Sequence, residues 1–177
     1  LMSMSRSLAA ALAVLAAGLL AAVPARAVEV QRVTSPGGIE VWLVEDHSNP
    51  ILSLHFSFRG GSTRDPDGKE GLAYLASGLL DEGAGDMPSL EFRGTMEQNA
   101  IRLSFDAGRE DFGGTLRTLT KNRDLAGELL HLALTEPRFD PEPVERIRGQ
   151  ILAGLRREAN DPNTLAWRGL REALFSD

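Results

Sequence analysis

The sequence contains no cysteine, which excludes structural disulfides and zinc sites built on thiolates. It also has no excess of basic residues, because 19 Lys and Arg stand against 25 Asp and Glu, for a formal net charge of -6. A nucleic-acid-binding domain needs a basic surface, so we expect no nucleic-acid partner. The lack of cysteine leaves the redox compartment of the protein open.

Histidine is scarce, and the spacing of the three histidines does not predict a metal site. No two of His47, His55 and His131 have the four-residue separation that places two ligands on one helix face. We interpret all three as surface or boundary residues. The neighbouring acids Asp81 and Glu82 do not predict an acid–base couple either, because adjacent helical residues point in different directions.

The first 27 residues have the pattern of an export signal. Arg6 provides a positive charge, 16 Ala- and Leu-rich residues follow from Leu8 to Val23, and Ala25-Arg26-Ala27 is an A-x-A cleavage site. The apolar run is shorter than the roughly 20 residues of a membrane span. We therefore expect residues 1–27 to be a cleaved signal peptide. The mature protein is then periplasmic or secreted, with no stable membrane span.

The remaining chain, 28–177, is long enough for about one domain with a buried core. Alternating apolar residues and turn signals predict strands, and apolar stripes with capping residues predict helices. The expected order is β-β-β-α-α-β-β-α-α-α. Strands grouped apart from helices indicate an α+β fold, with an antiparallel-rich sheet packed against helices. The expected strands are 28–34, 39–46, 51–58, 101–107 and 112–119, and the first two helices are 72–80 and 89–98, with a break at 83–88.

Three more helices are expected in the last third of the chain. The first has its apolar stripe between 125 and 133. The next two begin at N-cap residues, Asp140 and Asp161, each followed by a proline at the first helical position. We expect the first of these two helices to face the core with Val144, Ile147, Ile151, Leu152 and Leu155. The final helix carries Leu165, Leu170 and Leu174.

One segment, Gly71-Leu-Ala-Tyr74-Leu-Ala-Ser77-Gly78, resembles the zinc-binding helix of the pitrilysin/insulinase peptidases. In that family it reads roughly G-L-A-H-x-x-E-H, where two histidines bind zinc and the glutamate activates water. The corresponding positions here are Tyr74, Ser77 and Gly78. The third ligand of the family, a glutamate about 76 residues further on, falls at Gly154. The resemblance therefore implies a member without zinc ligands or general base.

Other local matches to the family occur in the same order from about Val30 to Asp177. They imply that residues 28–177 form an insulinase-like, metallopeptidase-like N-terminal domain that is truncated at its C-terminal end. If Gly78 is only a relic, Gly78→Ala should stabilise the helix, provided that no other helix packs on that position. The matching segments are Trp42–Asp46, Gly60–Ser62, Gly68–Ala73, Asn99–Ala100 and Pro137–Pro141.

The resemblance implies a non-catalytic subunit of an exported zinc peptidase, one that closes the chamber and helps to hold peptide. Its heterodimer partner would be a catalytic homologue that keeps H-x-x-E-H. We expect zinc only in that partner, and no cofactor or metal ligand in this chain. Two alternatives stay open. One is a structural or peptide-binding protein on the same fold, and the other is a longer chain with an active zinc domain beyond Asp177.

The pair Asn99-Ala100 is the candidate substrate contact. In active relatives the strand that begins here lies beside the site and holds extended substrate by strand addition. A plain core strand is the simpler interpretation of the same residues.

Overall fold

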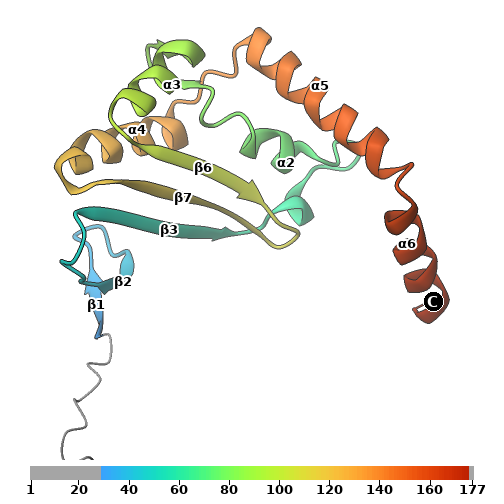
Figure 1. Cartoon of the computed structure of the whole chain (residues 1–177), viewed down its shortest axis with the longest axis horizontal. Helices are drawn as coiled ribbons and strands as arrows, with labels where there is room; N and C mark the ends of the chain where they lie inside the picture. Colours follow the sequence, from blue (N-terminus) through green and yellow to red (C-terminus); the bar gives the residue numbers. More distant parts are fainter. Residues whose placement is uncertain (1–28, 176–177) are drawn as a thin grey trace, which may run out of the picture. The chain divides into compact units, whose positions relative to one another are not determined.

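The computed structural model describes residues 29–175, in two compact units that meet in sequence between Ser48 and Asn49 (Figure 1). The expected signal peptide, residues 1–27, lies outside the described residues. Within the described part of the chain, no helix is both long enough and apolar enough to cross a membrane.

The first unit is an antiparallel hairpin of β1 (Val30–Thr34) and β2 (Glu40–Val44). Its turn closes where the Gly38 N–H donates to the Ser35 carbonyl, and Gly38 takes the left-handed conformation that favours glycine. The hairpin predicted from the turn residues is therefore confirmed.

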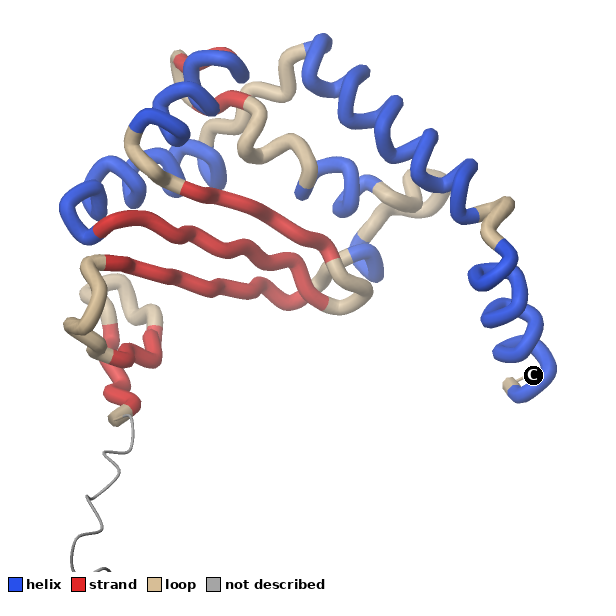
Figure 2. The backbone as a smooth tube through the Cα atoms, viewed as in Figure 1, coloured by secondary structure: helices blue, strands red, loops and turns tan. Residues whose placement is uncertain are grey.

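The second unit contains a three-stranded antiparallel sheet in the order β3-β7-β6 (Figure 2). Its strands are β3 (Ile51–Arg59), β6 (Arg102–Ala107) and β7 (Asp111–Leu119). The register aligns Leu54, Leu116 and Leu103 in one row on the face that carries the core. Because strand side chains alternate between faces, the polar residues of the predicted alternation occupy the opposite, outer face.

Helices α3 (Ser89–Gln98) and α4 (Arg123–Thr135) provide the other half of the core, which includes the fully buried Phe92 and Leu129. The remaining helices are α2 (Leu72–Ser77), α5 (Pro141–Glu158) and α6 (Pro162–Leu174), and two short 3-10 turns occupy 62–64 and 120–122. The arrangement is the α+β fold that the sequence predicts, with an antiparallel sheet packed against helices.

One predicted boundary is wrong near the start of this unit, and the predicted break between the helices contains two short strands. Helix α2 ends at Ser77, and Leu79 and Leu80 are buried in the turn that follows rather than on the helix. Because Leu79 and Leu80 are apolar and stand at helical spacing from Leu72, the sequence pattern predicted a helix that is longer than the observed one. The expected break at 83–88 is a small hairpin of β4 (Gly83–Ala84) and β5 (Met87–Pro88), in which Gly83 and Gly85 adopt positive φ angles.

The expectation that the apolar stripe of α5 faces the core is wrong for the C-terminal part of that helix. Leu152 is 44% exposed and Leu155 is 54% exposed. A stripe shows that one helix face is apolar, but it does not say what packs against that face. The three leucines of the α6 stripe, Leu165, Leu170 and Leu174, are also exposed.

Both predicted N-cap positions are confirmed, although the two aspartates act differently. Asp161 caps α6 by accepting a hydrogen bond from the Thr164 N–H at 3.0 Å. The Asp140 carboxylate instead accepts from the Arg138 guanidinium at 2.8 Å and makes no capping bond.

A buried carboxylate joins three segments of this unit. Glu82, whose side chain is 7% exposed, accepts hydrogen bonds from the Ser89 hydroxyl at 2.6 Å, from Arg146 at 2.6 Å and from Arg93 at 3.2 Å. These partners lie on α3 and α5. Burial raises the pKa of Glu82, but the bonds from Arg146 and Ser89 and the charges of both arginines outweigh it, so the pKa lies below its ordinary value.

Asp81, the neighbour of Glu82, has the opposite shift. Burial raises the pKa of its carboxyl above the ordinary value, and the negative charge of Glu82 adds to this effect. The charges of Arg93 and Arg146 reduce the rise without cancelling it. Two adjacent acids therefore affect folding in opposite directions at neutral pH.

We predict that Glu82→Gln lowers the free energy of unfolding at pH 7 by about 1–3 kcal/mol, because an amide cannot neutralise two arginines. The stabilisation by Glu82 is present above the unfolded pKa of about 4.3 and is lost as the pH falls through the lower folded value. Asp81→Asn should raise stability at pH 7, since no carboxylate then has to be ionised in a buried position. Urea unfolding at pH 7 and pH 3 measures both effects. Equal destabilisation by the two substitutions at pH 7 would contradict this account.

Candidate functional site

The three degenerate positions of the zinc helix lie on α2 and at its end, and none offers a metal ligand. Tyr74 is 55% exposed, and Ser77 is buried with its hydroxyl donating to the Tyr74 carbonyl at 2.8 Å. Gly78 is the C-cap residue in a right-handed helical conformation. The three positions therefore hold an exposed phenol at Tyr74, a hydroxyl that is bonded to its own helix at Ser77, and no side chain at Gly78.

Helix α5 packs directly on Gly78. A Cβ at this position would lie 3.1 Å from the Ile147 Cγ2, closer than an ordinary van der Waals contact. Gly154, where the third ligand would fall, lies about two turns further along α5. Nothing lies within 4 Å of the place where its Cβ would stand. The two glycines thus have different surroundings, one crowded and one open.

The residues at these four positions do not fit a zinc ion, since Tyr74, Ser77, Gly78 and Gly154 supply neither an imidazole nor a carboxylate. Elsewhere in 29–175, no three His, Asp or Glu side chains are grouped so that they could hold a metal. The histidines lie apart, on the loop after β2, on β3 and on α4, and His55 forms a hydrogen bond with the Thr115 hydroxyl at 3.1 Å.

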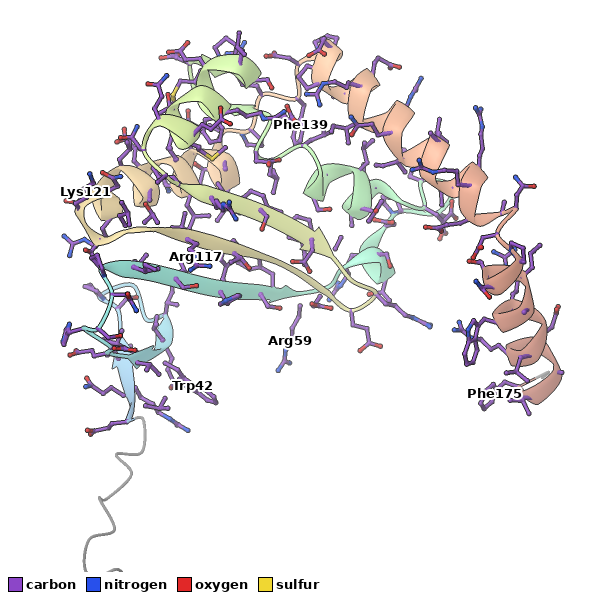
Figure 3. The ribbon with its side chains drawn as sticks, in the orientation of Figure 1. Trp42, Arg59, Arg117, Lys121, Phe139 and Phe175 are labelled. Atoms are coloured by element: carbon purple, nitrogen blue, oxygen red, sulfur yellow. The ribbon has the colours of Figure 1, made fainter. Side chains whose placement is uncertain are left out.

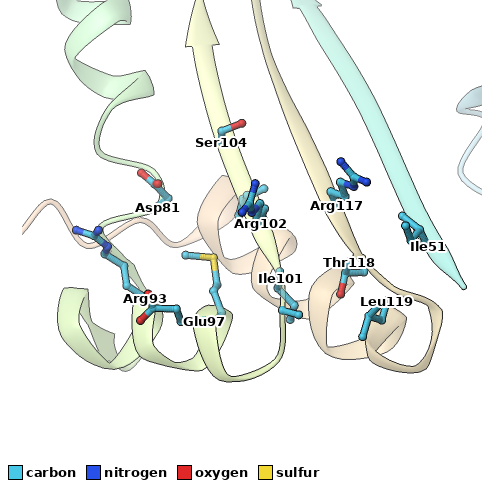
Figure 4. Close-up of a pocket in the computed structure, with 13 residues that line it drawn as sticks. Ile51, Asp81, Arg93, Glu97, Ile101, Arg102, Ser104, Arg117, Thr118 and Leu119 are labelled. Carbon is cyan, nitrogen blue, oxygen red and sulfur yellow. The ribbon is translucent and has the colours of Figure 1, made fainter.

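A groove of about 870 Å³ runs along β6 (Figure 4). Its wall includes five consecutive residues, from Ala100 to Ser104, together with Arg93, Met96 and Glu97 of α3. Consecutive strand residues point to opposite faces of a sheet. Three of the five, Arg102–Ser104, belong to β6, so the cavity reaches both faces and the edge at the start of this strand. It also touches the ends of β3 and β7, at Ile51 and Arg117–Leu119.

That edge has no strand partner among the described residues, because β6 pairs with β7 and ends the sheet. β6 is therefore a core strand, because Leu103 belongs to the buried core, and at the same time the edge strand of its sheet. An edge strand presents unpaired N–H and C=O groups to which another extended segment can bind.

Asn99 and Ala100 precede β6 in the turn after α3, and the structure separates their roles. Asn99 is the C-cap residue of α3, and its amide donates to the Thr95 carbonyl at 2.9 Å. Ala100 has a φ angle of 51° and lines the groove. Only the second residue of the predicted pair therefore lies where a ligand could contact its side chain.

The groove also brings together residues that the sequence analysis did not select. These are Asp81, Arg102, Arg117 and Thr118. Thr118 is buried on the core face of β7, and its hydroxyl has no hydrogen-bond partner within 29–175. The strand alternation places Arg102 and Arg117 on the outer face, but only the register between β6 and β7 shows that they are neighbours.

Comparisons with known proteins support the resemblance. No protein-family model matches the chain. The non-peptidase homologue YmxG of Helicobacter pylori is 33% identical over 133 residues, which are 75% of this chain and 31% of that protein. The inactive domain of an M16 peptidase from Pseudomonas fluorescens is 26% identical with a TM-score of 0.72, over 81% of this chain and 35% of that one.

A protease from Helicobacter pylori has the same fold at 18% identity, with a TM-score of 0.63 over 78% of this chain and 34% of the protease. The chain therefore spans about a third of the length of each of these proteins.

The two glycines at ligand positions should respond differently to alanine. Stabilisation by Gly78→Ala was expected only if no other helix packs on this position. Helix α5 does pack on it, so the condition is not met. We predict that Gly78→Ala lowers the free energy of unfolding by about 1 kcal/mol through contact with Ile147. Gly154→Ala should raise it by up to about 1 kcal/mol, as expected in an open helix interior. Denaturant unfolding measures both.

A chain with Ile147→Ala serves as the control. In an Ile147→Ala chain the added methyl at Gly78 has room, so Gly78→Ala should be neutral or stabilising there. Stabilisation by Gly78→Ala in the unmodified chain would show that α5 does not constrain the position.

Proposed function

Because the chain belongs to the pitrilysin/insulinase (M16) family and lacks its zinc motif, we propose that it is the non-catalytic subunit of an exported zinc peptidase. The observation that carries the proposal is the joint loss of both histidines, the general base and the glutamate ligand, at Tyr74, Gly78, Ser77 and Gly154. The scaffold around these positions is retained. A chain with the fold but without the ligands contributes surface to a complex rather than chemistry.

The proposed partner is a homologue that retains H-x-x-E-H and carries the zinc. The names of two relatives, a non-peptidase homologue and an inactive peptidase domain, support a non-catalytic role. In the proposed heterodimer the two chains face each other across a chamber. Closing the chamber would exclude water and hold an extended peptide in register with the partner's zinc.

The groove along β6 is the proposed site for holding peptide. An extended peptide that pairs with the edge of β6 would form main-chain hydrogen bonds along Arg102–Ser104, without a requirement for one sequence. The same groove favours the second candidate, a peptide-binding protein that acts without a peptidase partner. The two functions differ in whether the chain changes the activity of a catalytic homologue.

Export is proposed from the sequence of residues 1–27 alone. We predict that cleavage follows Ala27, because Ala25-Arg26-Ala27 is the cleavage pattern after the apolar run. N-terminal sequencing of exported protein should begin at Val28. An intact N-terminus in the membrane fraction would contradict a cleaved signal.

We predict that the full-length chain alone has no peptidase activity and holds no stoichiometric zinc after dialysis, because it has neither ligands nor base. A catalytic homologue from the same source should cleave peptides severalfold faster once this chain is added. The measurements are zinc analysis and peptide hydrolysis by each chain and by the mixture. The negative control is the catalytic homologue in which the general-base glutamate of H-x-x-E-H is replaced.

Restoring the motif alone should not create an enzyme. The triple change Tyr74→His, Ser77→Glu and Gly78→His still lacks a carboxylate at Gly154, and Ile147 would crowd the second histidine. Zinc-dependent turnover by the unmodified chain alone would overturn the proposed role. An unchanged rate in the mixture would favour the peptide-binding alternative.

A further inference from the structure

Two arginines stand directly opposite each other on the outer face of the sheet. Arg102 of β6 and Arg117 of β7 are cross-strand partners in the register, and both are exposed (Figure 4). Neither side chain forms an ion pair or a hydrogen bond with any residue in 29–175. Like charges directly opposite in a sheet destabilise it. The pair is therefore a local excess of positive charge that the described residues do not neutralise.

The pair also lies at a defined place, because both arginines line the groove along β6. The third cation of the groove, Arg93, is already bound to Glu82 at 3.2 Å. The next row of the outer face, His55, Thr115 and Ser104, carries no carboxylate. The acids of the groove, Asp81 and Glu97, lie on the segment after α2 and on α3, so the charge that the outer face of the sheet contributes comes from Arg102 and Arg117.

We propose that Arg102 and Arg117 determine specificity, by binding an acidic side chain of a peptide held along β6. This inference rests on the proposed peptide-holding function of the groove. A strand added to the edge of β6 places every second side chain on the outer face, and one of them lies about 5 Å from Arg102, measured between Cβ atoms. A carboxylate there accepts charge-assisted hydrogen bonds from Arg102, while Arg117 adds a second positive charge from the next strand.

The same geometry disfavours a basic side chain at that position. A lysine would meet two guanidinium groups without a counter-ion, which gives discrimination by repulsion as well as by attraction. Peptides with an acidic residue at one defined position are therefore the substrate class that fits this groove.

The test measures binding of labelled extended peptides to the full-length chain by fluorescence anisotropy. The peptides are identical except for Glu, Gln or Lys at one position, which is moved along the series. We expect the Glu peptide to bind about threefold to tenfold more tightly than the Gln peptide in one register, and the Lys peptide to bind more weakly than both. The preference should shrink as salt is added.

Substitutions then test which residues cause the preference for the Glu peptide over the Gln peptide. Arg102→Gln and Arg117→Gln should each reduce the Glu-over-Gln ratio toward one, chiefly by weakening the binding of the Glu peptide. Arg59→Gln is the matched control, because Arg59 is an exposed arginine of the same sheet outside the groove (Figure 3). Melting temperatures of the two groove variants should stay level or rise, since each removes a like-charge contact.

The outcomes separate this inference from the proposed function. Equal binding of the Glu, Gln and Lys peptides would overturn the role of the arginines and leave peptide holding intact. Binding of no peptide, with or without the catalytic homologue, would overturn both. If the arginine substitutions weaken assembly with that homologue but leave the peptide preference unchanged, the pair serves the subunit interface and the inference is wrong.

Discussion

The buried Glu82 carboxylate holds together the part of the molecule in which the site lies. It receives hydrogen bonds from Ser89 and Arg93 on α3 and from Arg146 on α5, so the segment after α2 is tied to two helices far apart in sequence. A buried charge with partners from several segments is stable only when all of them are in place. The wall of the β6 groove formed by α3 and the contact of α5 with Gly78 both depend on this arrangement.

Loss of catalysis in this protein changes side chains and leaves the packing in place. Helix α5 still meets the end of α2, with Ile147 against the position where the family has its second histidine. The edge of β6 remains unpaired within 29–175, and a groove follows it. This edge is the feature on which the proposed role of holding peptide for another subunit rests. Beside it lie Arg102 and Arg117, whose side chains have no ion-pair partner within 29–175 and which carry the proposed preference among peptides.

Local sequence features determined much of this fold. The turn at 35–38 and the alternation in 51–58 predicted the hairpin and β3, and the helix predicted for 89–98 is α3 with the same bounds. These features are local because they depend on residues a few positions apart, which backbone geometry makes neighbours. The absence of zinc ligands at Tyr74, Ser77 and Gly78 is likewise a matter of residue identity. It follows from the sequence once the resemblance has aligned the motif.

Tertiary structure alone decided the features that depend on distant segments. The apolar pattern through Leu79 and Leu80 did not reveal that α2 stops at Ser77, because the same residues are buried in a turn as well as on a helix. The edge position of β6 and the pairing of Arg102 with Arg117 follow from strand register, which links residues 15 positions apart. The sequence by itself determined that the positions of the zinc motif carry no zinc ligand. Its groove and the charge beside it arose only when long-range pairing placed those residues together.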